Sequence, residues 1–210
     1  TQNYAENGAK LIERNRLPEA RANFERITGQ IGRMGRIIRN LRAFARNEPE
    51  AIETVELSES VSEALALAQR RIEAAGVTVQ YEPPSNPVWV RGGRVRLQQV
   101  IVNLLTNALD ALEAAPETKP RRVQLSVAEG REFTQLSVED TGPGIADPDR
   151  VFEPFYSTKE AGASKGLGLG LSISYGIIGS FGGKLTCENA SGGGAAFRMS
   201  LLADPQEEAA

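Results

Sequence analysis

The chain has 210 residues, of which 40% are hydrophobic and 24% are charged, and its formal net charge is -3. These values are ordinary for a folded globular protein and give no electrostatic basis for binding nucleic acid. Cys187 is the one cysteine and histidine is absent, which excludes a disulfide framework and a Cys/His zinc site. No apolar run reaches the roughly 18 residues of a spanning helix, and the N-terminus lacks a signal-peptide pattern.

The first quarter of the sequence predicts a helical hairpin. Apolar residues recur at alternating spacings of four and three, as in a coiled coil or an antiparallel bundle, at Ala20, Phe24, Ile27, Ile31, Met34, Ile38, Leu41 and Ala45. The pattern predicts a helix from about Pro18 to Arg46, preceded by a shorter helix that holds Tyr4. A second copy of the hairpin, making a four-helix dimer, is favoured as the partner of the stripe. The alternative is that the long helix packs on the chain's own second domain.

The rest of the sequence alternates between strand and helix patterns. Strands are expected at 54–57, 77–81, 88–91, 122–128, 133–139, 184–188 and 196–202, and helices at 58–75, 94–114 and 167–181. This order predicts an α+β fold, a two-layer α/β sandwich in which a mixed sheet carries helices on one face. The expected domains are the hairpin at 1–48, the α/β domain at 49–203 and a disordered tail at 204–210.

Two asparagines, Asn103 and Asn107, lie four residues apart on one of the predicted helices and therefore share a face. Two carboxamides in this arrangement can hold a metal ion or its water ligands. The alternative is a capping or solvated pair, which the flanking leucines and alanines of a buried helix disfavour.

Asp140 ends an apolar strand and enters a glycine turn with the sequence DTGPGI. A carboxylate in that place can accept a hydrogen bond from an exocyclic amine, while Gly142 and Gly144 let the backbone approach a flat ring. Taken alone, such a segment is more often a plain Asp-Gly turn.

A second glycine run, Gly166, Gly168 and Gly170, opens a predicted helix. Backbone amides and the helix dipole form a phosphate site at such a position, although a run of this kind taken alone is more often a flexible loop. It fits neither a P-loop nor a Rossmann fingerprint. The aromatic segment VFEPFYSTK lies before it, so the order of the four segments carries more weight than any one of them.

The four segments in this order resemble the ATP-binding domain of two-component sensor histidine kinases, in the superfamily that also holds gyrase, the MutL ATPases and the Hsp-type chaperones. The matches are Asn103 and Asn107 for the N box, Asp140, Gly142 and Gly144 for the first glycine box, Phe152 and Phe155 for the F box, and Gly166, Gly168 and Gly170 for the second glycine box. The resemblance covers about residues 54–202. NALDAL, EPFYSTK and GLGLSISYGII look most like the dicarboxylate-transport and nitrogen-regulation sensors, and RMGRIIRNLRAFAR resembles the second helix of the dimerisation and phosphotransfer domain.

This resemblance implies ATP or ADP with Mg²⁺ as the ligands. Asp140 would bind the adenine amino group, Asn107 would coordinate Mg²⁺ with support from Asn103, and residues 146–165 would form a mobile lid. The implied nucleotide-binding residues are Asn107, Asp140, Gly142, Gly144, Ile145, Phe152, Phe155, Thr158, Lys159, Lys165, Gly166, Leu167, Gly168, Leu169 and Gly170. Lys159 and Lys165 are candidates for contacts from the lid to the phosphates, with a solvated lysine as the alternative for each.

Three departures from the family pattern bear on activity. The ATPase branches carry a glutamate that activates water where this chain has Asn103, which favours a kinase. Asp110 stands where many histidine kinases have a basic residue near the phosphates, so the lid would supply that contact or it is lost. The hairpin begins about three turns after the place of the family's phosphorylated histidine. We therefore expect a fragment or a redesigned chain that binds ATP without phosphorylating itself.

The resemblance also implies partners and a location for the intact parent. These are a homodimer formed through the hairpin and the receiver domain of a response regulator, with no nucleic acid and no membrane contact by this fragment. The parent would be anchored in the inner membrane, with this portion in the cytoplasm. The alternative functions are a hydrolytic ATPase or protein serine kinase of the same superfamily, and a structural dimerisation module with a degenerate nucleotide pocket.

Overall fold

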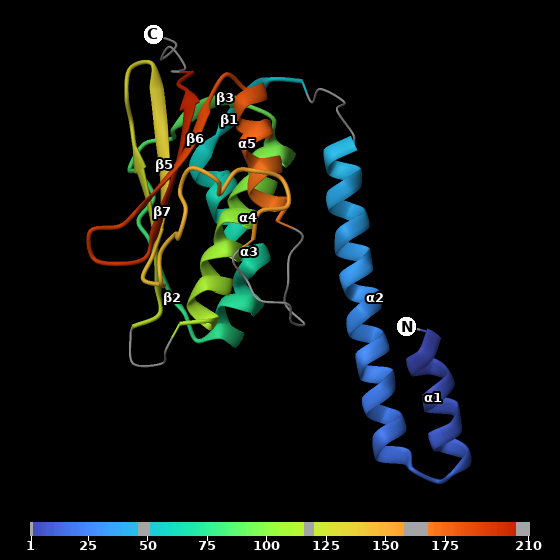
Figure 1. Cartoon of the computed structure of the whole chain (residues 1–210). Coiled ribbons are helices and arrows are strands. Elements are labelled where there is room, and N and C mark those ends of the chain that lie inside the picture. The colour runs from blue at the N-terminus through green and yellow to red at the C-terminus, as the bar shows by residue number, and fades with distance from the viewer. Residues whose placement is uncertain (1, 46–50, 116–119, 158–167, 205–210) are drawn as a thin grey trace. The chain divides into compact units, whose positions relative to one another are not determined.

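The computed structural model describes residues 2–45, 51–115, 120–157 and 168–204. The chain forms two compact units, one made by the two N-terminal helices and the other by the elements from β1 to β7 (Figure 1). No helix in these described ranges is long and apolar enough to cross a membrane.

The first unit is the hairpin of α1 (Gln2–Glu13) and α2 (Leu17–Ala45). Asn15 makes the turn with a φ of 57°, a left-handed conformation that asparagine tolerates better than most residues. The Arg16 amide then donates to the Leu11 carbonyl over 2.8 Å and closes the end of α1. The connection therefore lies just before Pro18, near which the sequence predicts the start of the long helix.

The apolar stripe of α2 is covered by α1 only in part. Ala20 is buried between the two helices, whereas Phe24 is 49% exposed and Ile31 is 59% exposed. Ile12 and Leu17 are exposed as well and line one groove with Ala20 and Phe24. The side chains of Met34, Ile38, Leu41 and Ala45 lie outside the described residues. The hairpin thus carries an apolar face that its own two helices do not bury.

The second unit contains a five-stranded mixed sheet. Its strand order is β2 (Thr78–Tyr81), β4 (Arg122–Ala128), β5 (Phe133–Asp140), β7 (Ala195–Leu202) and β6 (Lys184–Asn189). β2 pairs with β4 in parallel and the other neighbours are antiparallel. β1 (Glu53–Glu56) and β3 (Trp89–Gly92) form a separate antiparallel pair. β6 is therefore an edge strand of the main sheet.

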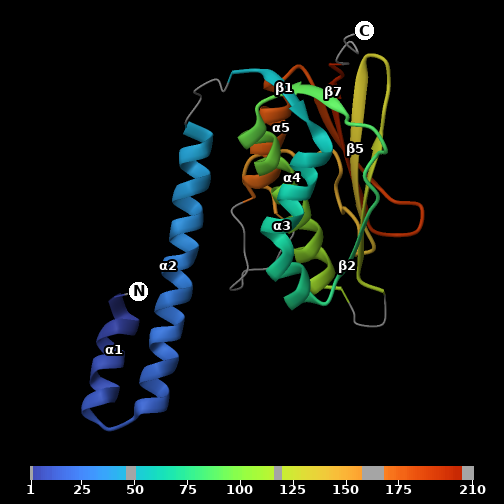
Figure 2. The same ribbon diagram turned by 180° about the vertical axis from the view of Figure 1, so that it is seen from behind.

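Three helices cover one face of this sheet, as Figures 1 and 2 show: α3 (Leu57–Ala75), α4 (Arg94–Glu113) and α5 (Gly170–Ser180). α4 contributes the largest set of fully buried side chains to the core, namely Leu97, Ile101, Leu104, Leu105, Leu109 and Leu112. Burying one such side chain stabilises the fold by about 1.5–3 kcal/mol. The two-layer α/β architecture confirms the predicted fold class.

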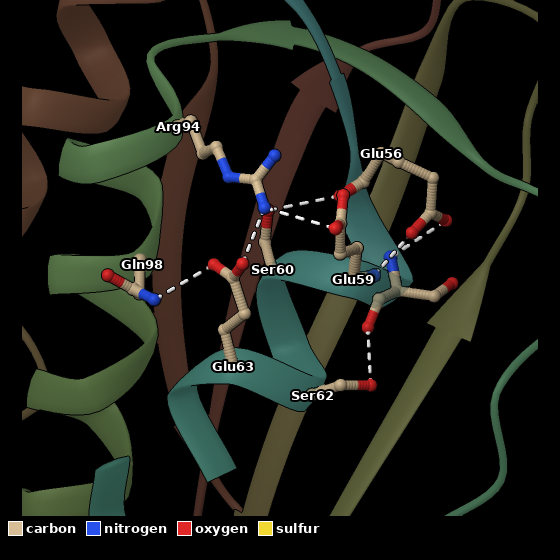
Figure 3. Close-up of polar contacts among 8 residues, drawn as sticks. Glu56, Glu59, Ser60, Ser62, Glu63, Arg94 and Gln98 are labelled. Atoms are coloured by element: carbon tan, nitrogen blue, oxygen red, sulfur yellow. Dashed lines mark hydrogen bonds and ion pairs between the residues drawn. The ribbon is translucent and has the colours of Figure 1, made fainter. Parts of the chain in front are cut away.

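The start of α3 is fixed by the side chain of Glu56, shown in Figure 3. Its carboxylate accepts hydrogen bonds from the backbone amides of Ser58, at 3.0 Å, and Glu59. A carboxylate at this position satisfies amides that the helix leaves unpaired and interacts favourably with the helix dipole. Because of this cap the first strand ends at Glu56, and Leu57, which the sequence assigns to that strand, opens the helix instead.

α3 and α4 are joined by ion pairs near both of their ends. Near their N-terminal ends, Arg94 of α4 lies 3.1 Å from Glu59 and 2.5 Å from Glu63 of α3 (Figure 3). Near their C-terminal ends the signs are reversed, and Arg71 of α3 pairs with Asp110 of α4. Asp110 lies on α4 three residues after Asn107, so its ion pair bears on the site described next.

Candidate functional site

Asp140, the last residue of β5, is a buried carboxylate with only 3% of its surface exposed. Its Oδ1 accepts hydrogen bonds from the backbone amides of Gly142, at 2.8 Å, and Ala195, at 3.3 Å. No donor among the described residues is bonded to Oδ2. The carboxylate is therefore held through one oxygen, and the other oxygen can accept a hydrogen bond from a ligand.

Burial raises the pKa of Asp140, because desolvation disfavours the charged form. The two backbone amides on Oδ1 oppose this effect, and the charge of Glu139 adds to it. A carboxylate kept in such a place is costly unless a ligand supplies the missing hydrogen bond, and buried groups with a shifted pKa are concentrated at functional sites.

The turn after Asp140 leaves no room for side chains at its two glycines. A Cβ on Gly142 would stand 2.8 Å from Asp140 Oδ1 and 3.3 Å from the side chain of Ala111 of α4. Gly144 has a φ of +86°, which other residues rarely adopt. The glycines are needed because the backbone runs close to Asp140 and to α4.

Asn189 holds the end of this turn and was not predicted from the sequence. Its Oδ1 accepts from the Ile145 amide at 2.6 Å, and its Nδ2 donates to the Ile145 carbonyl at 3.0 Å. Asn189 lies 44 residues further along the chain, at the end of β6. No local sequence signal identifies such a contact, because it depends on the sheet order.

Asn103 and Asn107 project from α4, as their spacing predicts, but their surroundings differ. Asn103 Nδ2 donates to the hydroxyl of Ser174 in α5 at 3.0 Å, and its Oδ1 would meet a Cβ on Gly170 at 2.5 Å. Asn107 Nδ2 is buried and has no hydrogen-bond partner among the described residues. Asn103 thus joins α4 to α5, while Asn107 carries an unsatisfied donor, an arrangement that native proteins seldom keep without a reason.

The acidic residue on the same helix, Asp110, pairs with Arg71 of α3. The same guanidinium lies 3.8 Å from Glu113. A cation is therefore present one turn beyond Asn107, and α3 brings it rather than α4. The sequence shows an acidic residue, Asp110, where a basic residue was expected. Only the packing of α3 on α4 shows that Arg71 lies beside it.

The two aromatic residues of the F box are placed differently. Phe152 packs against the core, with its ring 5.1 Å from Tyr175 of α5 and 6.5 Å from Phe197 of β7. Phe155 is 70% exposed and has a φ of +67°, which is uncommon for an aromatic residue. Phe152 therefore attaches this segment to the α/β unit, whereas Phe155 points to solvent.

The second glycine box leads directly into α5. The Phe155 amide donates to the Gly168 carbonyl at 3.0 Å, Leu169 is buried as the N-cap, and Gly170 is the first helical residue. Among the described residues no side chain caps this helix N-terminus, so its amides can face an anion. Thr158, Lys159, Lys165, Gly166 and Leu167 lie outside the described residues, as does the part of the predicted lid from 158 to 165, whereas residues 146–157 of that lid are described.

The described residues thus bring together a carboxylate acceptor, a close glycine turn, a buried amide and a helix N-terminus. Within these residues no group of three or more His, Cys, Asp or Glu side chains could hold a metal ion. A Mg²⁺ ion bound through one or two protein oxygens and substrate phosphates fits this set better than a metal cage made by protein alone. Chemically, the arrangement suits a nucleotide with a base amino group and an anionic tail.

Comparison with known proteins agrees with this geometry. Residues 92–205 match the family model described as histidine kinase-, DNA gyrase B-, and HSP90-like ATPase. The C4-dicarboxylate transport sensor protein DctB of Pseudomonas aeruginosa is 38% identical over 216 residues, covering 99% of this chain and 35% of that protein. The chain therefore spans about a third of the length of this curated relative.

Two solved structures of the histidine kinase ThkA have the same fold. The nucleotide-free catalytic domain is 28% identical with a TM-score of 0.63, covering 74% of this chain and 99% of that one. ThkA in complex with the response regulator protein TrrA is 24% identical with a TM-score of 0.68, covering 87% of this chain and 51% of that one. The chain belongs to the family of histidine kinase-, DNA gyrase B- and HSP90-like ATPases, and its second unit is a catalytic domain of the sensor histidine kinase type.

Proposed function

We propose that this chain binds ATP with Mg²⁺ as the kinase core of a sensor histidine kinase. In the intact enzyme the γ-phosphoryl group would pass from ATP to a histidine and then to a response regulator. Asp140 is the observation that carries the proposal, because its buried carboxylate is held through Oδ1 and keeps Oδ2 for the adenine amino group.

The remaining roles follow from the position of each group. Asn107 would offer its amide oxygen to Mg²⁺ and its unpartnered Nδ2 to a phosphate oxygen. Gly168, Leu169 and Gly170 would present the backbone amides of α5 to the phosphates, while Lys159 and Lys165 would reach them from the lid. A Mg²⁺ ion held at Asn107 would neutralise part of the phosphate charge. Phosphoryl transfer needs mainly such positioning, so no protein nucleophile is required in this domain.

Asn103 disfavours steady hydrolysis of ATP. A carboxamide cannot take a proton from water as a carboxylate can, and the Asn103 amide is already engaged with Ser174. The hydrogen bond from Asn103 to Ser174 favours a structural role for Asn103, in which it fixes the position of α5 and its N-terminus against α4. No feature of the described residues favours the serine kinase or the degenerate structural module.

The phosphoryl acceptor is not in this chain, since its 210 residues contain no histidine. We therefore propose that the chain binds ATP without phosphorylating itself. The exposed apolar face of the hairpin supports a homodimer, which sedimentation analysis of the chain can test. A response regulator receiver domain would be the downstream partner of the intact kinase, whose membrane-anchored form would hold this part in the cytoplasm.

Calorimetric titration of the chain with ATP and Mg²⁺ tests the central proposal. The unchanged chain should bind, and Asp140→Asn should bind about ten- to a hundredfold more weakly, because the amide presents a donor or a weaker acceptor to the base amino group. Equal affinity of the two proteins for ATP would show that Asp140 does not bind the adenine amino group. No binding by the unchanged chain would refute the proposed function.

A further inference from the structure

The segment that follows Asp140 runs beside the edge strand β6 and is attached to it by side chains. Asn189 bonds the Ile145 peptide at 2.6 and 3.0 Å, and two residues earlier on β6 the thiol of Cys187 lies 3.6 Å from the Pro148 carbonyl. The contacts advance in opposite directions along the two segments, as in an antiparallel pair. Side chains thus replace the backbone ladder at this edge of the sheet.

Asn189 contributes most to this attachment because it bonds both polar groups of one residue. Its carboxamide accepts from the Ile145 N–H and donates to the Ile145 C=O, which is the pair of bonds that a facing residue makes in an antiparallel ladder. Gly144 lies so close that a Cβ there would stand 2.6 Å from Asn189 Oδ1. The side chain therefore fixes the position as well as the direction of the turn.

The two ends of the glycine turn are consequently both fixed by the β6–β7 hairpin. Asp140 at its start accepts from the Ala195 amide, the first of β7, and Ile145 at its end is held by Asn189, the last of β6. The turn between them carries the glycines that let the backbone approach a ring. Any movement of Ile145 would change the surface that faces a base bound at Asp140.

We propose that Asn189 is a positioning residue of the adenine site, which orders the turn after Asp140 before the nucleotide arrives. This inference rests on the proposed function. Without the two bonds, the turn would have to be ordered when the base binds, and that cost would appear as lost affinity. The loss would fall on the base and not on the phosphate tail, since Asn189 is hydrogen-bonded to Ile145 and to no described residue at the N-terminus of α5.

The test compares Asn189→Ala with Gln135→Ala in the full chain. Gln135 donates through its own carboxamide to the hydroxyl of Ser200 at 3.3 Å within the same sheet, without touching the turn. Calorimetry should show that Asn189→Ala weakens the binding of ATP and of ADP by the same factor, about tenfold. Gln135→Ala should bind both nucleotides with the affinity of the unchanged chain. Asn189→Asp, which keeps the acceptor but faces the Ile145 carbonyl with oxygen, should also lose affinity.

Two further readouts separate positioning from general stability. Inosine triphosphate carries an oxygen where ATP has its amino group, so the preference for ATP over inosine triphosphate should narrow in Asn189→Ala. Hydrogen exchange at the Ile145 amide of the nucleotide-free protein should accelerate in Asn189→Ala and stay unchanged in Gln135→Ala. Unchanged exchange at Ile145, or ATP binding by Asn189→Ala equal to that of Gln135→Ala, would overturn the inference, even where the unchanged chain binds ATP normally.

Discussion

The burial of Asp140 gives a testable dependence of stability on pH. Desolvation raises the pKa of this carboxyl, so between the ordinary aspartate pKa and the raised value the folded state binds more protons than the unfolded state. The contribution of Asp140 to stability is therefore fully present below the ordinary pKa and is lost as pH rises through the raised pKa.

Urea unfolding of the nucleotide-free chain and of Asp140→Asn between pH 4 and pH 7 measures this contribution. We expect the difference in unfolding free energy to move in favour of the unchanged chain as pH falls, because only it can take up the proton. At pH 7 the variant should be at least as stable as the unchanged chain, although it binds ATP more weakly. A difference that is constant with pH would show that Asp140 is not destabilised by its burial.

Asn107 is expected to act through the metal ion, since its amide is buried and its Nδ2 lacks a partner among the described residues. Asn107→Ala should weaken ADP binding in Mg²⁺ by about tenfold and change binding in a chelator much less, because one oxygen ligand is lost. Gln98→Ala is the matched control, as that carboxamide of α4 bonds Glu63 instead. Equal losses with and without Mg²⁺ would mean that Asn107 only shapes the pocket.

At the level of the elements, the ion pairs that Arg71 and Arg94 make between α3 and α4 are expected to differ in strength. The Asp110 side chain is 16% exposed, so Arg71→Ala removes the guanidinium from a largely buried carboxylate and should destabilise the fold by about 1–3 kcal/mol. Arg94→Ala removes a cation that is itself 46% exposed, from carboxylates that water can reach (Figure 3). Denaturant unfolding should therefore show a clearly smaller loss for Arg94→Ala, and equal losses would contradict this ranking.

The helices and strands were largely predictable because each is encoded locally. Glycine after α3, periodic apolar residues on α4 and alternating residues in β4 and β5 place these elements within a few residues of their observed ends. The differences come from contacts that are distant or unusual. Leu57 joins α3 because Glu56 caps it, and β1 with β3 leaves the main sheet to form its own pair.

At the scale of the whole molecule, the absence of histidine predicts that the chain does not become phosphorylated by ATP. Incubation of the chain with γ-labelled ATP and Mg²⁺ should leave no acid-labile phosphate on it, even though nucleotide binds. As a positive control, the chain is added to a sensor kinase that keeps its histidine but has lost its nucleotide site. Phosphohistidine on that kinase would show that this chain can transfer the γ-phosphoryl group of ATP. Stable label on serine or threonine of this chain would contradict the histidine kinase proposal and favour a serine kinase.

The sequence by itself determined the class of fold, the ordered set of nucleotide-binding segments and the absence of an acceptor imidazole. These depend only on residue type and on spacing along the chain, which can be read from the sequence. The sequence also shows that Asp110 departs from the family pattern, but it does not show that Asp110 pairs with Arg71. The contacts of Lys159 and Lys165 with the phosphates remain a prediction, because both lysines lie outside the described residues.

Only the tertiary structure decided how the site is held. Asp140 Oδ1 is bonded by β7, the turn after it is bonded by Asn189 of β6, and Asp110 is paired with Arg71 of α3. Each of these contacts joins residues between 39 and 55 positions apart. Such pairs have no period or local motif, because they arise from the order in which strands pair and from the face on which helices pack.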